Sequence, residues 1–573
     1  MRIRVLAVDF DNTIAFNDRL DNDVAKTLQD ARRYGILRIL VTGRILSDLL
    51  ALLPAPDLFD AIVAENGAVL QLPNNPRPVA LSPGPDAALV TELSRRRITH
   101  RCGICIVETA AAASHDVLTT IQNLGLPRAI SFNRDRLMVL PYGISKAQGL
   151  SAALWRLGAS PHNAVAIGDA ENDQPLLDAC EIGVAVGWGS DALKRGADEV
   201  IQGSGPQAVA EYLRGLLAMG TIPPDRIHHR LLRLGTRENG KPADGMIRGR
   251  NLLVAGDPRS GKSWIAGLVC EQLIFKGYSL CILDPEGDYT QLDSLTGVIV
   301  HRLGQGTDSF PDLERILRQP ALSLVVDMSA IVAGAKPALV RSFLERVNAL
   351  RRSVGLPHRV VLDEAHYFLG RPEDAQLFDR ELGGYLLVTY RITDLSSDVL
   401  NATDCVIVTR VTDRRLAAGL LALVPAVPAS SDLPDTLTGL AIGEALLLPG
   451  SPESGNEATR FRIDPRQTAH VRHRQKYINV AVPPGEEFVF TRQGRATEWR
   501  ARTLGEFLAV LPQVSEEVLR SHMARGDFHR WIEAVFGDHE LGDAIRLIEK
   551  RDDSNARKLI LRMIQDRYVQ AVS

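Results

Sequence analysis

Short apolar runs separated by polar loops recur along most of this chain. Runs at 2–8, 36–42, 252–255 and 405–409 have the length and the β-branched content of buried strands. A stretch of helical spacing begins at position 265, directly after one of the loops. Strands that alternate with helices predict an α/β fold built on parallel sheets.

A length of 573 residues exceeds what one hydrophobic core supports, so several domains are expected. We predict a first domain over 1–220, a linker over 221–250, a second domain over 251–470 and a mostly helical C-terminal module over 471–573. The first domain would carry a small α/β cap over about 72–142, where strand-like and helix-like runs alternate.

Composition narrows the class of protein. Hydrophobic residues make up 45% and charged residues 24% of the chain, as in ordinary globular proteins. The formal net charge of −3 gives no overall basic surface, so any binding of nucleic acid would need a local basic patch or an inner pore. No apolar run reaches about 18 residues, and positions 1–10 read as a strand, so neither a membrane span nor a signal peptide is expected. Six cysteines in so long a chain favour a reducing, cytoplasmic location.

Two carboxylates follow the first apolar run, in the sequence Asp9-Phe10-Asp11-Asn12-Thr13. Sites form at the carboxyl ends of strands in doubly wound sheets. Two aspartates there can share Mg²⁺ and divide the work of nucleophile and acid/base. Taken alone, the pair is also compatible with a capped loop.

Later segments strengthen this prediction by adding a hydroxyl, a cation and more carboxylates, namely Thr42, Lys146, Asp169 and Asp173. Lys146 stands near a helix start, where a cation suits a phosphoryl group. Asp169 and Asp173, four positions apart on a loop, would complete an all-oxygen Mg²⁺ site with Asp9 and Asp11.

These residues occur in the order of the four motifs of the haloacid dehalogenase (HAD) superfamily phosphatases, which the chain resembles over about 1–220. It resembles more narrowly the Cof-like branch with a type IIB cap, because Glu65-Asn66-Gly67-Ala68 and the segment 183–203 match that branch. The resemblance implies a Rossmannoid domain with a small cap. The cap is similar in size to that of archaeal phosphoglycolate phosphatases, and small caps usually admit small phosphorylated metabolites.

The resemblance also implies roles for the site residues. Asp9 would form an aspartyl-phosphate, and Asp11 would protonate the leaving group and then activate water. The phosphoryl ligands would be Thr42, Arg44 and Lys146, and the Mg²⁺ ligands would be Asp9, Asp11 through its backbone carbonyl, Asp169 and Asp173. Asn12 stands where a glycine is usual, and asparagine tolerates unusual backbone angles.

The run at 252–255 leads into GDPRSGKS, a full match to the phosphate-binding pattern G-x-x-x-x-G-K-[ST]. Its glycines let successive N–H groups face phosphate oxygens. Lys262 would reach the β- and γ-phosphates, and Ser263 would bind Mg²⁺ at a helix N-terminus. The predicted ATP-binding residues are Gly256, Asp257, Pro258, Arg259, Ser260, Gly261, Lys262, Ser263 and Asp363.

A second motif, HRVVLDEAHY at 358–367, carries Asp363 and Glu364 to the end of a short apolar strand. Asp363 would hold the water shell of Mg²⁺, and Glu364 would orient and deprotonate the attacking water. The adjacent acidic pair favours an ATPase that drives motion over a kinase or a GTPase.

The segments LDPEGDY, YRITDLSSDVLNATDCVIVTR and LTGLAIGEALLLPG resemble HerA/FtsK-like ring ATPases, over roughly 247–466. The resemblance implies a RecA-like (ASCE) P-loop NTPase domain, a hexamer and double-stranded DNA in its pore. Tyr390 stands where a glutamine is usual, and the phosphatase domain replaces the small β-barrel that typically precedes the motor. Candidates for an arginine acting on a neighbouring subunit are Arg391, Arg410 and Arg414.

Three further features favour structural over functional interpretations. A basic cluster in the linker includes Arg226 and Arg237. We favour a solvated helix over an arm that contacts nucleic acid. Cys102 and Cys105 form a lone C-x-x-C, for which packing outweighs zinc. In the tail, a packed helical pair with a polar rim is favoured over a metal-ligand role for His522, Asp527 and His529.

Two functional hypotheses stay open, besides a disfavoured nucleotide-gated scaffold with a silent phosphatase. In the first, the motor translocates DNA and the phosphatase acts on a nucleic acid end or a nucleotide. In the second, the ATPase ring is a platform for a metabolite phosphatase without nucleic acid. The near-neutral charge and Tyr390 favour the second hypothesis, and the HerA-like segments favour the first.

Overall fold

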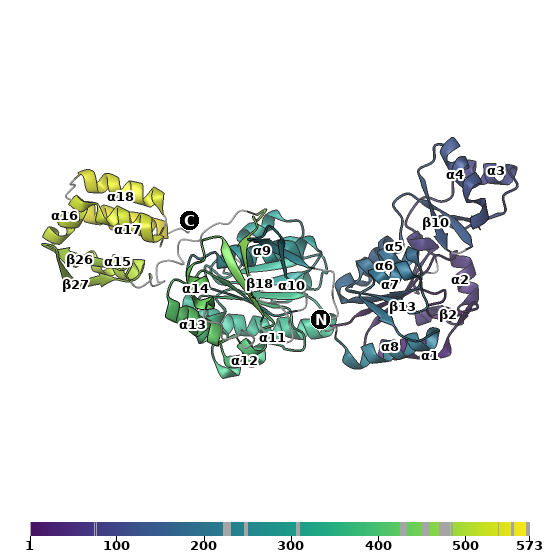
Figure 1. Cartoon of the computed structure of the whole chain (residues 1–573), viewed down its shortest axis with the longest axis horizontal. Coiled ribbons are helices and arrows are strands. Elements are labelled where there is room, and N and C mark those ends of the chain that lie inside the picture. Colours follow the sequence, from purple (N-terminus) through teal and green to yellow (C-terminus); the bar gives the residue numbers. More distant parts are fainter. Residues whose placement is uncertain are drawn as a thin grey trace.

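The computed structural model describes residues 2–73, 75, 77–133, 135–221, 231–245, 250–304, 310–424, 432–449, 458–468, 482, 485–536, 538–551 and 555–568. Figure 1 shows an N-terminal body with a cap, a central body built on a large sheet, and a C-terminal helical body. The α/β class predicted from the apolar runs is therefore confirmed. None of the described helices is long and apolar enough to cross a membrane.

The N-terminal body is built on one mixed sheet whose first six strands, in spatial order, are parallel. Its order is β14 (Glu199–Ile201), β13 (Ile182–Val186), β12 (Ala164–Gly168), β1 (Val5–Val8), β4 (Leu37–Val41), β5 (Ala61–Ala64), β6 (Val69–Gln71) and β7 (Val79–Ala80). Helices α1 (Asn22–Arg33), α2 (Leu46–Leu52) and α8 (Pro206–Met219) cover one face, and α5 (Lys146–Leu157) and α6 (Gln174–Ala179) cover the other. Cover on both faces explains why these strands are almost wholly apolar.

The cap is a separate antiparallel sheet with its own small core. Its strands follow the order β10 (Arg128–Asn133), β11 (Arg136–Pro141), β9 (Val107–Ala110) and β8 (His100–Cys102). Helices α3 (Ala87–Arg95) and α4 (Ser114–Asn123) pack on it. The sequence prediction started the cap at about 72, but β7 pairs with β6 in the main sheet, so the cap sheet and its helices begin after Ala80.

The central body is built on an eleven-stranded sheet. The order is β16 (Pro242–Gly245), β15 (Leu232–Arg237), β25 (Thr459–Ile463), β24 (Glu444–Pro449), β23 (Cys405–Thr409), β17 (Leu252–Ala255), β22 (Tyr385–Thr389), β21 (Arg359–Leu362), β18 (Leu280–Asp284), β20 (Ser323–Asp327) and β19 (Val298–Arg302). The strands from β23 to β19 are parallel, and those from β24 to β16 are antiparallel. Helix α9 (Lys262–Phe275) covers one face, whereas α10 (Phe310–Leu317), α11 (Lys336–Val354) and α13 (Arg414–Ala422) cover the other.

The hairpin of β15 and β16 corrects the prediction of a linker over 221–250. Thr236 pairs with Arg462 of β25, so the hairpin extends the central sheet. Leu232 and Leu234 alternate with polar residues and are buried in the core beneath α9, which is the pattern of a half-buried strand. Part of the predicted basic cluster, Arg226 to Arg230, lies outside the described residues.

The C-terminal body is mostly helical, as predicted. A hairpin of β26 (Phe488–Arg492) and β27 (Arg495–Ala501) packs with α15 (Leu504–Val510), α16 (Glu516–Arg525), α17 (Asp527–Phe536), α18 (His539–Arg551) and α19 (Ala556–Tyr568).

A buried polar contact joins the N-terminal and central bodies at the amino ends of their strands. His162, just before β12, stacks on Tyr278, just before β18, with ring centroids 3.7 Å apart. The Tyr278 hydroxyl donates to Glu181 Oε2 at 2.8 Å, and His162 Nε2 lies 2.8 Å from the Lys276 carbonyl oxygen. Catalytic groups of α/β proteins lie at the opposite, carboxyl ends. The contact therefore fixes the two bodies without obstructing either sheet edge where a site is expected.

We expect Tyr278→Phe to loosen this contact. The variant keeps the stacked ring but removes a hydroxyl donor from the fully buried Glu181, and such a loss costs about 1–3 kcal/mol. The midpoint of urea unfolding should fall, whereas Tyr34→Phe, at an exposed tyrosine, should leave it unchanged. Equal midpoints for Tyr278→Phe and the parent protein would contradict this role for the hydroxyl.

Candidate active sites

Three buried carboxylates meet at the carboxyl edge of the N-terminal sheet. Asp9 follows β1, and Asp169 and Asp173 follow β12. One oxygen of each lies within 4.8 Å of the others. Neighbouring parallel strands end at the same edge, which explains how residues 160 positions apart in the chain converge.

Lys146 lies among these carboxylates. It begins α5, whose N-cap is Ser145, and its side chain is buried. Its Nζ donates to Asp9 Oδ1 at 2.6 Å and to Asp173 Oδ1 at 2.5 Å. Burial lowers the pKa of Lys146, but Asp173 and Asp9 outweigh burial and hold that pKa above its ordinary value. The lysine is therefore a fixed cation beside Asp9.

The carboxylate group fits a hard divalent cation. Its donors are all oxygens, the ligands that Mg²⁺ prefers. Asp173 is oriented by its other oxygen, which accepts N–H bonds from Asp169 at 3.0 Å and from Ala170 at 3.1 Å. Burial raises the pKa of Asp9 well above its ordinary value, although Lys146 opposes the shift. A cation here would stabilise the charged form. Asp11 does not contribute its carboxylate to this group, which agrees with a backbone role.

Arg44, one of the three predicted phosphoryl ligands, contacts two carboxylates in the structure. Its guanidinium donates to both carboxylate oxygens of Asp11, with Nε to Oδ2 at 2.8 Å, and it also contacts Asp18. These bonds raise the pKa of Arg44. The sequence prediction paired Arg44 with the substrate, whereas the structure pairs it with the predicted acid/base residue.

Thr42 and Asn12 occupy the positions that the motifs imply. Thr42 is buried at the end of β4, and its hydroxyl accepts the backbone N–H of Arg44 at 3.2 Å. Asn12 has φ of +53°, so the residue that replaces a usual glycine does adopt a left-handed conformation. The Trp188 indole donates to the carbonyl of Asn12 at 2.7 Å, which holds the loop after Asp11.

Glu65 ties the cap to the main sheet, a role that sequence reasoning missed. It is fully buried, and its carboxylate accepts N–H bonds from Ile104 at 2.9 Å and Cys105 at 2.7 Å. The C-x-x-C segment is thus a backbone anchor for Glu65. Cys102 is exposed and Cys105 is buried, and neither joins a metal-binding group within the described residues.

A cavity of about 160 Å³ lies between the cap and the main sheet. Asp11, Asn12 and Arg44 line it from below, and the cap residues Glu108, Asp135, Arg136 and Met138 line it from above. Arg136 Nη1 lies 3.5 Å from Glu108 Oε2. The cavity opens on the predicted acid/base residue.

The second site begins at the loop between β17 and α9. Gly256 and Gly261 have φ of +145° and +106°, and a Cβ on Gly256 would lie 2.2 Å from Thr409 Oγ1. Glycine is therefore required at 256 by sterics. Lys262 Nζ donates to the Asp257 carbonyl at 2.7 Å, inside the loop. The loop has the curled backbone of a phosphate cradle.

Ser263 contacts a carboxylate from the loop that follows β18. Its hydroxyl donates to Asp288 Oδ2 at 3.0 Å, and Asp288 is buried. The loop carrying Asp288 is held by Asp284, whose carboxylate accepts four backbone N–H groups. Burial raises the pKa of Asp284 to about 7. Asp288 therefore stands beside the predicted Mg²⁺ ligand Ser263.

Asp363 and Glu364 follow β21 and are buried on the same edge of the sheet. Strand β22 lies between β21 and the P-loop strand β17. Glu364 has φ of +48°, a conformation that costs a non-glycine residue energy and is enriched at functional sites. His366 Nδ1 lies 3.7 Å from Glu364 Oε2, and burial lowers the pKa of His366 to about 4. A neutral imidazole thus faces Glu364 at physiological pH.

The candidate arginines for a neighbouring subunit lie in three different settings. The backbone carbonyl of Arg410 accepts the N–H of Asp257 at 3.1 Å, so Arg410 adjoins the P-loop of its own chain. Arg391 lies over the Tyr390 ring at 5.2 Å, and that ring is 6.0 Å from Lys262 Nζ. Arg414 is exposed and pairs with Asp435 at 2.6 Å. These settings favour a role within the chain for Arg410.

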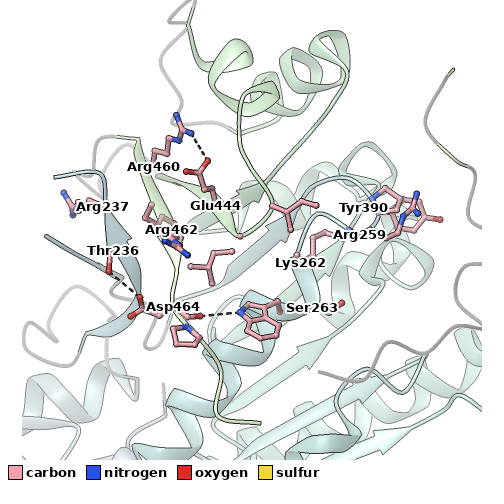
Figure 2. A pocket seen from close by; sticks show the side chains of 18 of the residues that line it. Thr236, Arg237, Arg259, Lys262, Ser263, Tyr390, Glu444, Arg460, Arg462 and Asp464 are labelled. Carbon is pink, nitrogen blue, oxygen red and sulfur yellow. Dashed lines mark hydrogen bonds and ion pairs between the residues drawn. The ribbon is translucent and has the colours of Figure 1, made fainter. Parts of the chain in front are cut away.

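A cavity of about 950 Å³ extends from the P-loop to the antiparallel edge of the central sheet (Figure 2). Lys262, Ser263, Glu364 and Tyr390 line its inner end. Strands β15 and β25 line the other end, so the hairpin interpreted as a linker forms a wall of this cavity.

The tail residues considered as ligands do not form a metal site within the described residues. His522 is buried and bonds to Asp527 at 2.7 Å and to the Thr491 N–H at 2.8 Å. His529 pairs with Glu549 instead. The favoured prediction, packed helices, is the one that the structure supports.

Comparison with known proteins identifies two of these bodies. Residues 104–213 match the family model of haloacid dehalogenase-like hydrolases, and residues 250–331 match the model described as Helicase HerA, central domain. The phosphoglycolate phosphatase of Methanopyrus kandleri is 28% identical over 232 residues, which cover 37% of this chain and 97% of that protein. The phosphoglycolate phosphatase of Methanothermobacter thermautotrophicus is 26% identical over 231 residues, covering 37% and 98%. A solved haloacid dehalogenase-like hydrolase from Bacteroides thetaiotaomicron is 18% identical with a TM-score of 0.34, covering 38% of this chain and 100% of that chain.

The fold and the matches define a hydrolase with two unlike α/β domains. The chain contains a haloacid dehalogenase-like domain, related to phosphatases, fused to a HerA-type domain.

Proposed function

We propose that the N-terminal domain is a Mg²⁺-dependent phosphohydrolase that works through Asp9. The observation that carries this proposal is the buried group of Asp9, Asp169 and Asp173 with Lys146 bonded to two of its members. A buried nucleophile beside a fixed cation and an oxygen-rich metal site is suited to phosphoryl transfer.

In the proposed reaction, an Asp9 oxygen attacks phosphorus, and the P–O bond to the substrate breaks as Asp11 gives its proton to the leaving oxygen. Asp11 then takes a proton from water, which attacks the same phosphorus and releases Asp9 and phosphate. Arg44 keeps Asp11 in place through its two bonds. Bound Mg²⁺, held by Asp9, Asp169, Asp173 and the Asp11 carbonyl, would neutralise charge on the phosphoryl oxygens.

We propose small phosphorylated metabolites as the substrates of this site. The cavity of about 160 Å³ beneath the cap favours a small phosphate ester over a bulky substrate. The relatives from Methanopyrus kandleri and Methanothermobacter thermautotrophicus are phosphoglycolate phosphatases, so phosphoglycolate is the first substrate to test.

Phosphate release from phosphoglycolate and from a 5′-phosphorylated oligonucleotide tests this assignment. We expect a larger kcat/KM for phosphoglycolate, and loss of activity with EDTA that excess Mg²⁺ restores. Preference for the oligonucleotide would move the substrate class to nucleic acid ends. Activity unchanged by EDTA would contradict the metal role.

We propose that the second domain binds and hydrolyses ATP. The P-loop and the buried pair Asp363 and Glu364 stand on the same sheet edge, at the inner end of a cavity large enough for a nucleotide. Glu364 would take a proton from the water that attacks the γ-phosphate, and Ser263 with Asp363 would hold Mg²⁺ and its water shell.

Ring formation and DNA-driven hydrolysis are a further part of this proposal, supported by the match to a HerA central domain. ATP hydrolysis with and without linear double-stranded DNA tests it, with Lys262→Ala as the blank. Stimulation by DNA and a hexamer in light scattering would support a DNA motor. A flat response from a ring would support the alternative, a platform for the phosphatase, and a monomer at saturating ATP would contradict both.

A further inference from the structure

The cavity at the P-loop is larger than the phosphate cradle, and its outer half is lined by residues outside the P-loop and the Asp363–Glu364 pair. The P-loop residues lie at one end, and β15, β24 and β25 form the other. A volume of about 950 Å³ falls in the range of sites that enclose whole cofactor-sized ligands. The part of a ligand that lies beyond its phosphates therefore has room in the outer half of the cavity.

The outer half has the chemistry of a site for a flat, partly polar ring. Trp264, Phe461, Ile442 and Pro465 line it with apolar surface. Ile442 is 67% exposed and adds apolar surface at the outer end of the cavity. Trp264 directly follows the predicted Mg²⁺ ligand Ser263, so it lies next to where the phosphates would bind.

The indole of Trp264 is held in one orientation. Its Nε1 donates to the Asp464 carbonyl at 3.4 Å, and the guanidinium of the buried Arg466 lies 5.9 Å from its ring centroid. Arg466 is in turn fixed by Glu271 at 3.0 Å. A preorganised aromatic surface binds a stacked ring without first losing its own rotamer freedom.

Arginines from β15 and β25 line the outer half, namely Arg237, Arg460 and Arg462. Arg460 also lines the cavity, but it bonds to Glu444 at 2.7 Å and lies 3.3 Å from Glu238. Arg462 is exposed on β25, and its charge acts on the neighbouring Glu444 without a direct ion pair among the described residues. Figure 2 shows Arg462 directed from β25 into the cavity, on the side where Lys262 and Ser263 lie. Its planar group can stack on a nucleobase or donate to ring nitrogens and sugar oxygens.

We propose that Trp264 and Arg462 form a nucleoside subsite, in which the base and sugar of the nucleotide lie between α9 and the edge formed by β15, β24 and β25. This proposal rests on the nucleotide binding proposed above and extends it to the nucleoside. The hairpin over 232–245 thereby becomes part of the nucleotide pocket. The ligand class is a nucleoside triphosphate, bound through its nucleoside as well as its phosphates.

Binding of ATP and of inorganic tripolyphosphate to the full chain separates the two halves of the cavity. Both should bind the parent protein, because both reach the P-loop. Arg462→Ala, at an exposed residue, should raise the Kd for ATP about 5-fold or more. The Kd for tripolyphosphate should stay within about twofold, since the P-loop contacts are untouched. Arg315→Ala, at an exposed arginine of α10, is the matched control and should change neither.

Trp264→Ala should raise the Kd for ATP by about 5- to 150-fold, the range that one stacked base contributes. Trp264→Phe, which keeps a flat ring, should recover most of that affinity. ATP affinity unchanged in Arg462→Ala and Trp264→Ala would overturn the subsite, and so would an equal loss for both ligands in Arg462→Ala. A parent protein that binds neither ligand would instead refute the proposed nucleotide function.

Discussion

Asp9→Asn should lower phosphatase turnover at least about 10³-fold, because it removes the proposed nucleophile. The amide keeps the size of the side chain, so the loss cannot be assigned to packing. ATP hydrolysis by the same variant should stay within a few-fold of the parent value, because Asp9 lies at the carboxyl edge of a different sheet. Initial rates of phosphate release from phosphoglycolate and from ATP measure both effects.

A matched control is Asp30→Asn, at a half-buried aspartate of α1 that pairs with the exposed Arg33. It should leave both activities unchanged. Retained phosphatase activity in Asp9→Asn would remove Asp9 as the nucleophile. Equal loss of both activities would mean that the two sites depend on each other.

Glu364→Gln should lower ATP hydrolysis by about 10²- to 10⁴-fold, the usual contribution of a general base. ATP binding should persist, since the P-loop and Lys262 are unchanged. Glu364 is buried with a left-handed backbone, and glutamine has the same length, so the local geometry should survive. Single-turnover hydrolysis and equilibrium binding of ATP measure the two effects separately.

The exposed Glu373 provides the control, and Glu373→Gln should hydrolyse ATP at the parent rate. Loss of binding together with hydrolysis in Glu364→Gln would assign Glu364 to nucleotide binding. Unimpaired hydrolysis would show that another group activates the water, and His366, with its pKa lowered to about 4, would be the nearest candidate.

Motifs confined to one strand and its following loop were predictable from the sequence. Asp9 after β1, the P-loop after β17 and Asp363 with Glu364 after β21 all follow apolar runs, and the carboxyl ends of parallel strands form one edge. The meeting of Asp9 with Asp169, Asp173 and Lys146 was expected for the same reason, and the geometry of the structure agrees with it.

Features that depend on pairing between distant segments were not predictable. The hairpin at 232–245 joins β25 more than two hundred positions later, and its Gly, Pro and Lys residues resemble those of a linker. Tertiary packing determines which side chains form hydrogen bonds. Examples are the bonds of Arg44 to Asp11, of Glu65 to the cap and of Ser263 to Asp288. Periodicity and spacing carry no information on such choices.

The most direct test of two separate hydrolytic sites in one chain is the Lys262→Ala variant, assayed beside the parent protein with phosphoglycolate and with ATP. Lys262 lies in the P-loop of the central body, where its Nζ donates to the Asp257 carbonyl and where it lines the cavity. If the two sites are separate, the variant should hydrolyse phosphoglycolate at the parent rate, and its ATP hydrolysis should fall to background. ATP hydrolysis could instead survive in Lys262→Ala and disappear in Asp9→Asn. That result would show that the phosphatase site cleaves both compounds, and it would contradict the proposal of two separate hydrolytic sites.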